Sequence, residues 1–518
     1  MSATRATQPS SQSFKVPKNA LLLKSVVMLA TFMQVLDMTI ANVALPHMQA
    51  ALGATQDNIS WVLTSYIVAA AVAIPLTGWL SDKIGRRTLY LWSVGGFMIA
   101  SMLCGVAANI EEMVLFRLLQ GLSGAFLSPL AQAVLVDTTP PEKRGQAMAV
   151  FGMGIVIGPI LGPVLGGWLT DNLDWRWVFF VNIPVGALAF AGLWLLLEDV
   201  KRPTKPFDYT GFILLAVALT ALQLMLDRGE RADWFNSIEI WLEAGLAASA
   251  FWMFVIHLLT GKHPIFSKEL LSDSNLVISA LLMSMVGFLM TTAMALLPLM
   301  LENLFGYPVM TSGMLLSSRG IGVLVMMGIT GKLISHVDSR VLVITGLAIA
   351  AFSFWEMTQW SLDMPWTVIA MNGLMQGAGM GMMFVPISTV GYATLPAHER
   401  TNAASLINLT RSIGSSIGIS VVVTLFTRST TVSHADLTEH MTADKLGIDP
   451  TQLGLPGNFT DMALTIMNAE VMRQATMIGF LNAFYFMLIT CICAIPFCFL
   501  FKRTSGPAVS DDPPEAIL

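Results

Sequence analysis

Long apolar segments recur along nearly the whole chain, and they restrict the fold more than any other feature of the sequence. A helix of about 20 apolar residues is long enough to cross the hydrocarbon layer of a membrane. The sequence is 55% hydrophobic and 12% charged, whereas about a quarter of the residues of a typical soluble domain are charged. This composition excludes a water-soluble globule with a single core. We expect an all-α integral membrane protein.

Fourteen apolar segments divide the chain into three parts. Six lie in an N-terminal lobe at 21–200, two in an insert at 208–260, and six in a C-terminal lobe at 275–501. The tails 1–20 and 502–518 and a segment at 427–477 are polar. We expect membrane-crossing helices near residues 21–46, 59–80, 89–108, 112–135, 146–169, 177–197, 209–226, 238–259, 275–298, 312–333, 341–359, 366–390, 402–426 and 478–501.

The basic residues predict how these helices are oriented. Lysine and arginine are in excess in cytoplasmic segments of membrane proteins. With the N-terminus placed inside, nineteen of the 28 lysines and arginines fall on the inner side, six on the outer side and three within spans. We predict that both terminal tails are cytoplasmic and that segment 427–477 lies outside.

The two lobes resemble each other at a fixed offset of 256 residues. Shared apolar composition does not by itself produce matches of glycine, proline and arginine at one offset. The sequence therefore predicts two pseudo-symmetric six-helix lobes joined by a two-helix insert, and many transporters place a substrate site between such repeats. The matched pairs are Gln120 and Gln376, Gly121 and Gly377, Pro140 and Pro396, Arg144 and Arg400, Gly158 and Gly414, and Gly162 and Gly418.

Asp37 lies within the first apolar segment, where an ionisable side chain is costly and commonly functional. Arg117 enters the fourth segment from the opposite direction. At 1.5 Å per residue both side chains lie roughly 8–9 Å below the outer surface, so we expect a direct or water-bridged pair. We assign proton coupling to Asp37 and Arg117. A purely structural ion pair is the alternative, although such a pair is a costly way to gain stability.

A charged loop follows the second apolar segment. Gly85 permits a tight turn, and Asp82 with Arg86 and Arg87 can form a charge network at the ends of neighbouring helices. A membrane anchor rich in basic residues, with an incidental aspartate, is the alternative. The loop begins at Gly78.

The fifth apolar segment carries glycines four residues apart, together with two prolines. Such glycines form a smooth helical face that allows close approach of another helix, and proline bends a helix because it lacks a backbone donor. We predict a gating helix whose partner is the span near 312–333, with a generic close-packed pair as the alternative. The residues are Gly154, Gly158, Pro159, Gly162, Pro163 and Gly166.

These segments together resemble a known family. The stretch Leu36-Asp37-Met38-Thr39-Ile40-Ala41-Asn42-Val43-Ala44-Leu45-Pro46, the loop Gly78–Arg87, Arg117-Leu118-Leu119-Gln120-Gly121 and the glycine-proline segment are similar to the motifs of the major facilitator superfamily. The branch they resemble is that of 14-spanner drug:proton antiporters, the EmrB-like multidrug efflux pumps. The resemblance implies the major facilitator fold, a cytoplasmic latch at 78–87, a glycine-proline face typical of antiporters, and the bacterial inner membrane.

The resemblance also implies proton-coupled export of hydrophobic or amphiphilic compounds by alternating access, without enzymatic activity. Burial favours the protonated form of a carboxyl group and a nearby guanidinium favours the ionised form, so the protonation of Asp37 can follow the conformation. No phosphate-binding loop of the G-x-x-x-x-G-K-[ST] type is present. We therefore expect the proton gradient to drive transport and no cofactor. Candidate substrate-cavity residues are Gln34, Asn42, Gln120, Arg319, Met380 and Met383.

The expected partners are small amphiphiles, protons and the lipid bilayer, with no nucleic acid. EmrB-like pumps imply an EmrA-like periplasmic adaptor and an outer-membrane channel, and segment 427–477 is then a periplasmic loop that can contact the adaptor. His434 and His440 lack a third ligand at metal-binding spacing, so we expect an exposed helix and no metal site. A proton-independent facilitator of one metabolite and a membrane scaffold are the alternative functions.

Overall fold

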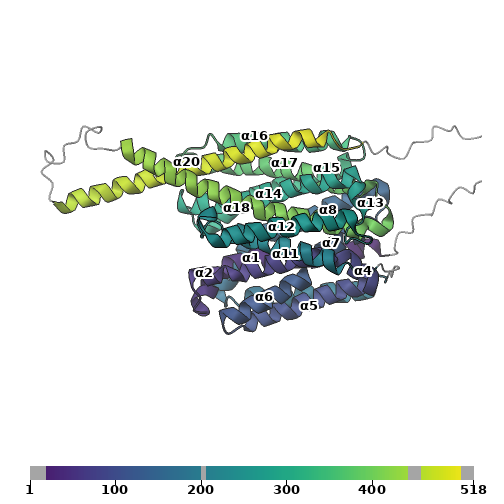
Figure 1. Ribbon diagram of the computed structural model, residues 1–518. Coiled ribbons are helices and arrows are strands. Elements are labelled where there is room, and N and C mark those ends of the chain that lie inside the picture. The colour runs from purple at the N-terminus through teal and green to yellow at the C-terminus, as the bar shows by residue number, and fades with distance from the viewer. Residues whose placement is uncertain (1–18, 200–205, 441–456, 503–518) are drawn as a thin grey trace, which may run out of the picture.

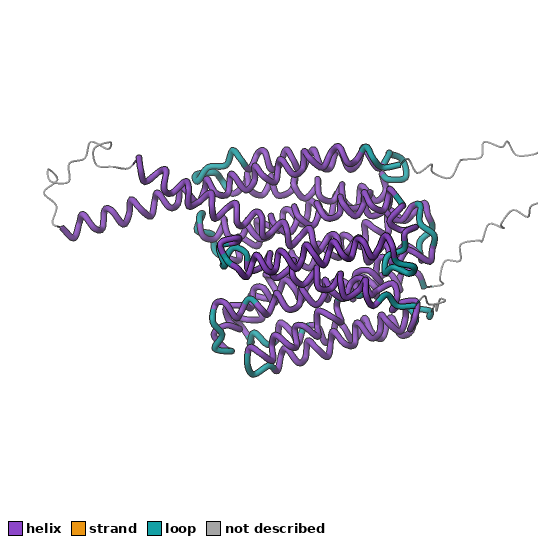
Figure 2. The backbone as a smooth tube through the Cα atoms, viewed as in Figure 1, coloured by secondary structure: helices purple, strands orange, loops and turns teal. Residues whose placement is uncertain are grey.

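The computed structural model describes residues 19–199, 206–440 and 457–502. All regular secondary structure in these ranges is helical (Figure 2). Fourteen helices or helix pairs within them are long and apolar enough to cross a membrane. The predicted all-α fold with fourteen spans is therefore confirmed.

The N-terminal lobe contains six spans, four of which combine two or more helical segments. The second span combines α3, the 3-10 turn Ile74–Leu76 and α4, and the turn contains Pro75. The fourth combines α6 and α7. The helices of the lobe are α1 Ala20–Ala51, α2 Gln56–Ile59, α3 Trp61–Ala73, α4 Thr77–Ile84, α5 Arg86–Val106, α6 Ile110–Gly124, α7 Leu127–Asp137, α8 Arg144–Asn172, α9 Trp177–Phe180 and α10 Asn182–Leu196.

The insert and the C-terminal lobe follow. Three further 3-10 turns lie at Pro141–Lys143, Trp234–Asn236 and Ala397–Glu399. The helices are α11 Tyr209–Arg228, α12 Ile238–Thr260, α13 Lys268–Ser272, α14 Ser274–Asn303, α15 Val309–Leu333, α16 Ser339–Met357, α17 Trp366–Ala393, α18 Arg400–His440 and α20 Gly457–Cys498.

Several helices begin where a side chain caps their free backbone N–H groups. Asn109 accepts a hydrogen bond from the Glu112 backbone, and Glu112 accepts one from the Ala108 backbone, so α6 begins with a reciprocal cap. The Asp208 carboxylate accepts from the Gly211 backbone and caps α11, and the Asp273 carboxylate accepts from the Leu276 backbone and caps α14. These caps fix where the insert and the C-terminal lobe start.

The spans lie side by side in one bundle, and α1 begins at the same end of the bundle at which α20 ends (Figure 1). We call this the terminal end and the opposite one the distal end. An even number of spans requires this placement. Within the N-terminal lobe α1 packs against α8 and α10, and within the C-terminal lobe α14 packs against α18.

The last two spans are longer than their apolar segments predict. Helix α18 continues through His440 and α20 begins at Gly457, so much of the expected loop 427–477 is helical. Both helices project beyond the bundle at the distal end (Figure 1). Hydropathy marks where a helix leaves the apolar layer and not where it ends, which explains the difference. Residues 441–456 and the tail segments 1–18 and 503–518 lie outside the described residues.

The insert helix α11 lies between the two lobes on one side of the bundle. Near its distal end the Asp227 carboxylate accepts a hydrogen bond of 2.6 Å from Thr64 on α3. The preceding residue, Leu226, accepts one of 2.8 Å through its backbone oxygen from Ser420 on α18. Helix α11 therefore connects the N-terminal lobe with the C-terminal lobe.

Candidate functional site

Asp37 and Arg117 form a direct ion pair inside the N-terminal lobe. The Arg117 Nη1 lies 2.7 Å from Asp37 Oδ2, and both side chains are fully buried. Asp37 is in the middle of α1, and Arg117 is in the second turn of α6. The expected contact is thus confirmed, while its role in proton coupling remains a prediction.

Two amides complete the hydrogen bonding of the Asp37 carboxylate. Gln120 Nε2 donates to Oδ1 at 2.9 Å, and Asn182 Nδ2 donates to the same oxygen at 2.6 Å. Asn182 also donates to Ser101, and the Gln120 amide oxygen accepts from Arg117 at 2.7 Å. The carboxylate is therefore held by α6 and α10 together, and a displacement of either helix changes its surroundings.

Arg117 is bound on its other sides as well. Its Nε donates to the Val62 carbonyl at 3.0 Å, and its guanidinium lies 4.6 Å from the centre of the Tyr66 ring. Stacking of this kind stabilises a buried cation. Protonation of Asp37 would leave this guanidinium without a counter-charge in the apolar interior, which is costly. Through these contacts the pair joins α1, α3 and α6.

The glycine face of α8 packs against α1 and not against the span near 312–333, so the predicted partner is wrong. A β-carbon at Gly158 would lie 2.7 Å from the Val35 side chain, and one at Gly162 would overlap the Thr39 side chain. Thr39 donates a hydrogen bond of 3.3 Å to the Gly158 carbonyl. A row of small residues shows that another helix comes close, but not which one. Gly154 and Gly166 complete this face against α1.

The other side of α8 meets α15 at the boundary between the lobes. A β-carbon at Gly320 would collide with the Ile160 side chain, so these two helices also pack closely. Beside this contact is a cavity of about 110 Å³ between α8, α14, α15 and α17. Its lining includes Pro159, Pro163, Met290, Arg319 and Met380. The prolines of the predicted gate therefore border a space that both lobes enclose.

The structure distributes the six predicted cavity residues over several places. Arg319 and Met380 line the cavity just described. Gln120 belongs to the Asp37 network, and Gln34 accepts a hydrogen bond of 2.8 Å from Ser128. Asn42 is exposed, and Met383 is fully buried beneath Gly346 of α16. Their role in substrate binding remains a prediction.

A charge bridge joins the lobes at the terminal end. Asp137, the last residue of α7, accepts from Arg86 at 2.7 Å and from Arg400 of the C-terminal lobe at 2.6 Å. Arg86 also donates to Thr401 at 3.1 Å. Gly85 separates α4 from α5 and has a positive φ of 93°, which glycine adopts readily. The turn lets α5 start at Arg86, whose side chain reaches this bridge. Arg87 instead donates to the Trp194 carbonyl within its own lobe.

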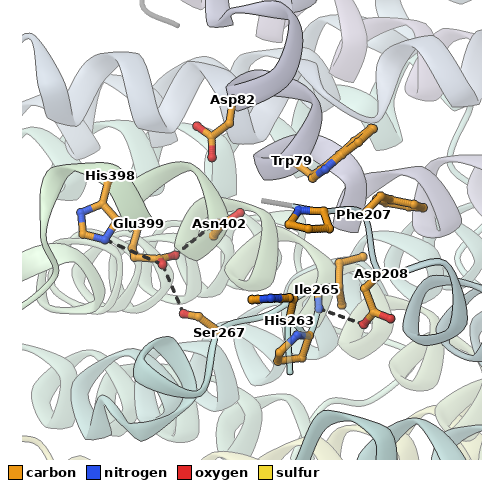
Figure 3. Close-up of a pocket in the computed structure, with 12 residues that line it drawn as sticks. Trp79, Asp82, Phe207, Asp208, His263, Ile265, Ser267, His398, Glu399 and Asn402 are labelled. Carbon is orange, nitrogen blue, oxygen red and sulfur yellow. Dashed lines mark hydrogen bonds and ion pairs between the residues drawn. The ribbon is translucent and has the colours of Figure 1, made fainter. Parts of the chain in front are cut away.

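Close backbone contact accompanies this bridge. A β-carbon at Gly78 would collide with the Asn402 side chain, which accounts for the glycine there. Asp82 lies nearby in the wall of a second cavity, of about 460 Å³, which is bordered by both lobes and by the segments that flank the insert (Figure 3). Trp79, Phe207, His263 and Glu399 are among its other lining residues.

Further hydrogen bonds between the lobes continue from this bridge toward the middle of the bundle. Ser405 donates to the Ile74 carbonyl at 2.6 Å, and Tyr392 and Asn408 both donate to the Gln132 side chain at 2.8 Å. At the distal half, the hydrogen bonds that the structure records between described parts of the two lobes run through the insert. This conformation is closed at the terminal end.

Asn182, Asp137 and Arg400 are the site residues that the sequence did not single out as functional. Asn182 is one polar residue in an otherwise apolar span, and its position gives no relation to Asp37 145 residues earlier. Arg400 appeared only as a repeat match, and the residue 256 positions after Asp137 is Ala393. The pair equivalent to Asp137 and Arg400 in the other repeat is Ala393 and Arg144, which cannot form an ion pair, so the bridge is not duplicated.

Comparison with known proteins gives matches over most of the chain. The family model described as Major Facilitator Superfamily matches residues 27–419. The multidrug export protein EmrB of Haemophilus influenzae is 37% identical over 424 residues, which are 81% of this chain and 83% of that protein. The fatty acid resistance protein FarB of Neisseria gonorrhoeae is 36% identical over 478 residues, 92% of this chain and 94% of that protein.

Solved structures agree on the fold. The proton:xylose symporter XylE superposes with a TM-score of 0.62 and 13% identity, covering 93% of this chain and 95% of its own. The human organic anion transporter MFSD10 superposes with a TM-score of 0.61 and 16% identity, covering 91% and 99%. At such low identity the likeness concerns the arrangement of helices.

Proposed function

Because the chain belongs to the Major Facilitator Superfamily, we propose that it exports hydrophobic or amphiphilic toxic compounds in exchange for protons. Multidrug export is the function named for its EmrB relatives, which share more than a third of their residues with it. Proton exchange is the finer part of the proposal. It rests on the fully buried pair of Asp37 and Arg117.

The mechanism follows from the contacts of that pair. A proton that reaches Asp37 removes the charge that neutralises Arg117 and weakens the hydrogen bonds from Gln120 and Asn182. The buried guanidinium then favours a conformation in which it gains water or another acceptor. Release of the proton restores the network. Proton loading and unloading would in this way bias the bundle between its two openings.

The experiment compares Asp37→Asn with the wild type in proteoliposomes that carry a pH gradient. Asn keeps the shape of the side chain and cannot carry the proton, so gradient-driven uptake of a fluorescent amphiphile into inverted vesicles and substrate-dependent proton movement should both be lost. Glu302→Gln is the control, because Glu302 is another acidic residue in a span, at the end of α14 away from this network. Full gradient-driven transport by a well-folded Asp37→Asn protein would refute the proposal.

A proton-independent facilitator of one metabolite is the second candidate. It predicts equal substrate equilibration with and without the pH gradient, and it gives no role to a fully buried carboxylate in the first span. The cost of keeping that ion pair in a membrane favours the antiporter.

The topology and the partners belong to the same proposal. The excess of basic residues on one side supports a bacterial inner-membrane protein with both termini in the cytoplasm. The projecting parts of α18 and α20 would then enter the periplasm. They lie against each other: His434 pairs with Asn468 at 3.0 Å, and at the base of the projection the Phe426 and Phe480 rings are 4.4 Å apart. Exposed Val432 and Ile466 give the projection an apolar surface that an EmrA-like adaptor, itself joined to an outer-membrane channel, could cover.

A further inference from the structure

Arg319 is a membrane-embedded cation with almost no protein acceptor. It lies in the span formed by α15, and only 7% of its surface is exposed. Its one hydrogen bond goes from Nη2 to the Met290 carbonyl at 3.3 Å, beyond the usual 2.7–3.2 Å range. None of the ion pairs among the described residues includes Arg319, whereas Arg117 has Asp37 at 2.7 Å.

An isolated buried charge of this kind is expensive. Charged side chains inside membranes generally pair with an opposite charge or line a path for a ligand. A guanidinium has five N–H donors in a planar fork, and this fork matches the two oxygens of a carboxylate. The single long bond to Met290 leaves most of these donors available. The protein alone therefore does not complete this site.

The space in front of Arg319 has the shape and the lining for an amphiphile. Arg319 borders the cavity of about 110 Å³, which is open on one side, so that a longer apolar body can extend out of it, and whose other walls are largely apolar. Met290, Met294 and Met380 supply flexible, polarisable side chains that adapt to different apolar bodies. Pro159 and Pro163 close the cavity from the N-terminal lobe. A ligand there would contact both lobes and the gating helix at once.

We propose that this cavity binds the acid group of an amphiphilic carboxylate, with Arg319 as its counter-ion and the methionine wall around its apolar body. The site therefore selects anions among the amphiphiles that the pump moves. This inference rests on the proposed export function for its physiological meaning, but binding can be measured without transport.

The experiment measures equilibrium binding of three probes that share one apolar body to the purified full chain in uncharged detergent. The probes are 4-butylbenzoate, the neutral 4-butylbenzamide and the cation 4-butylbenzylammonium. The benzoate should bind most tightly. Arg319→Gln should weaken benzoate binding about 10- to 100-fold, because one or two charge-assisted hydrogen bonds are lost, and should leave the amide unchanged. Arg319→Lys should recover part of the loss, since it keeps the charge without the fork.

Arg411→Gln is the matched control. Arg411 is a half-buried cation in α18 whose recorded acceptor is Asn408 at 3.4 Å, and it is not among the cavity-lining residues. Equal benzoate binding by Arg319→Gln and the wild type, or equal affinity of the wild type for benzoate and amide, would overturn the inference. So would abolition of benzoate binding by equimolar phosphatidylglycerol in the wild type, because a lipid phosphate would then be the occupant.

Transport separates this inference from the proposed function. If vesicles move the amide with the pH gradient but the protein shows no Arg319-dependent preference for the benzoate, only the anion site fails. If Arg319-dependent benzoate binding is present but no probe moves with the gradient, the site stands and the proposed function fails.

Discussion

The bridge between Asp137 and Arg400 should hold the terminal end closed, and Arg400→Gln isolates this effect. Arg400 belongs to the C-terminal lobe, whereas Asp137 and its other partner Arg86 belong to the N-terminal lobe. The substitution therefore removes the ionic contact across the lobes and leaves the ion pair within one lobe intact. Any effect on the opening of the terminal end can then be assigned to the contact between lobes.

The structure sets the size of the effect. The Arg400 and Asp137 side chains are 14% and 19% exposed, and their atoms lie 2.6 Å apart. A hydrogen bond between charged groups contributes about 1.5–3 kcal/mol, and little of it is screened at this burial. Loss of the contact should therefore shift the equilibrium between the closed and open terminal end roughly 10- to 140-fold toward the open form.

Spin labels at Glu142 and Ser335 can measure this shift by pulsed electron spin resonance. Both residues are exposed at the terminal end, one in each lobe, close to where Gly145 meets Ile334. In a transport-competent background without native cysteines, Arg400→Gln should transfer population to a longer distance. Lys262→Gln, which removes an exposed charge at the same end, should not. Identical distance distributions for the two variants would show that the bridge does not hold the closed state.

Two further predictions concern helix packing and the partner. Gly162→Ala should lower the unfolding temperature in detergent and reduce transport, because a methyl group would overlap Thr39 at a cost of about 1–3 kcal/mol. Gly167→Ala is the control and should behave as the wild type, because nothing lies within 4 Å of its β-carbon. Equal unfolding temperatures of the two variants would contradict the close-packing argument. Replacing residues 432–466 by a short glycine-serine linker should abolish co-purification with a co-expressed EmrA-like adaptor. Binding of the probes in detergent should persist. Undiminished co-purification would exclude docking of the adaptor on this projection.

Helix depth was predictable from the sequence because it depends only on the rise per residue. Counting residues from the ends of two apolar segments placed Asp37 and Arg117 at one level, and they meet at 2.7 Å. The glycine spacing of α8 likewise predicted a close helix contact. These features are local, so the sequence carries them directly.

The remaining features depend on which elements become neighbours. The glycines of α8 face Val35 and Thr39 of α1, although small residues in α15 offered an equally suitable surface. Asn182 reaches Asp37 only because α10 packs against α1. The extensions of α18 and α20 carry polar residues, so hydropathy gave no sign of their helical length. The spacing of residues in a single sequence does not indicate which distant segments come into contact.

The insert makes the two sides of the bundle mechanically unequal. Asp227 and Leu226 of α11 accept hydrogen bonds from Thr64 of α3 and Ser420 of α18, so α11 holds the two lobes together along one seam between them. At the other seam between the lobes α8 packs directly against α15, and no insert helix is recorded across this contact among the described residues. Separation at the distal end would be widest beside the cavity that Arg319 borders, which directs the exit path of a bound molecule toward that seam.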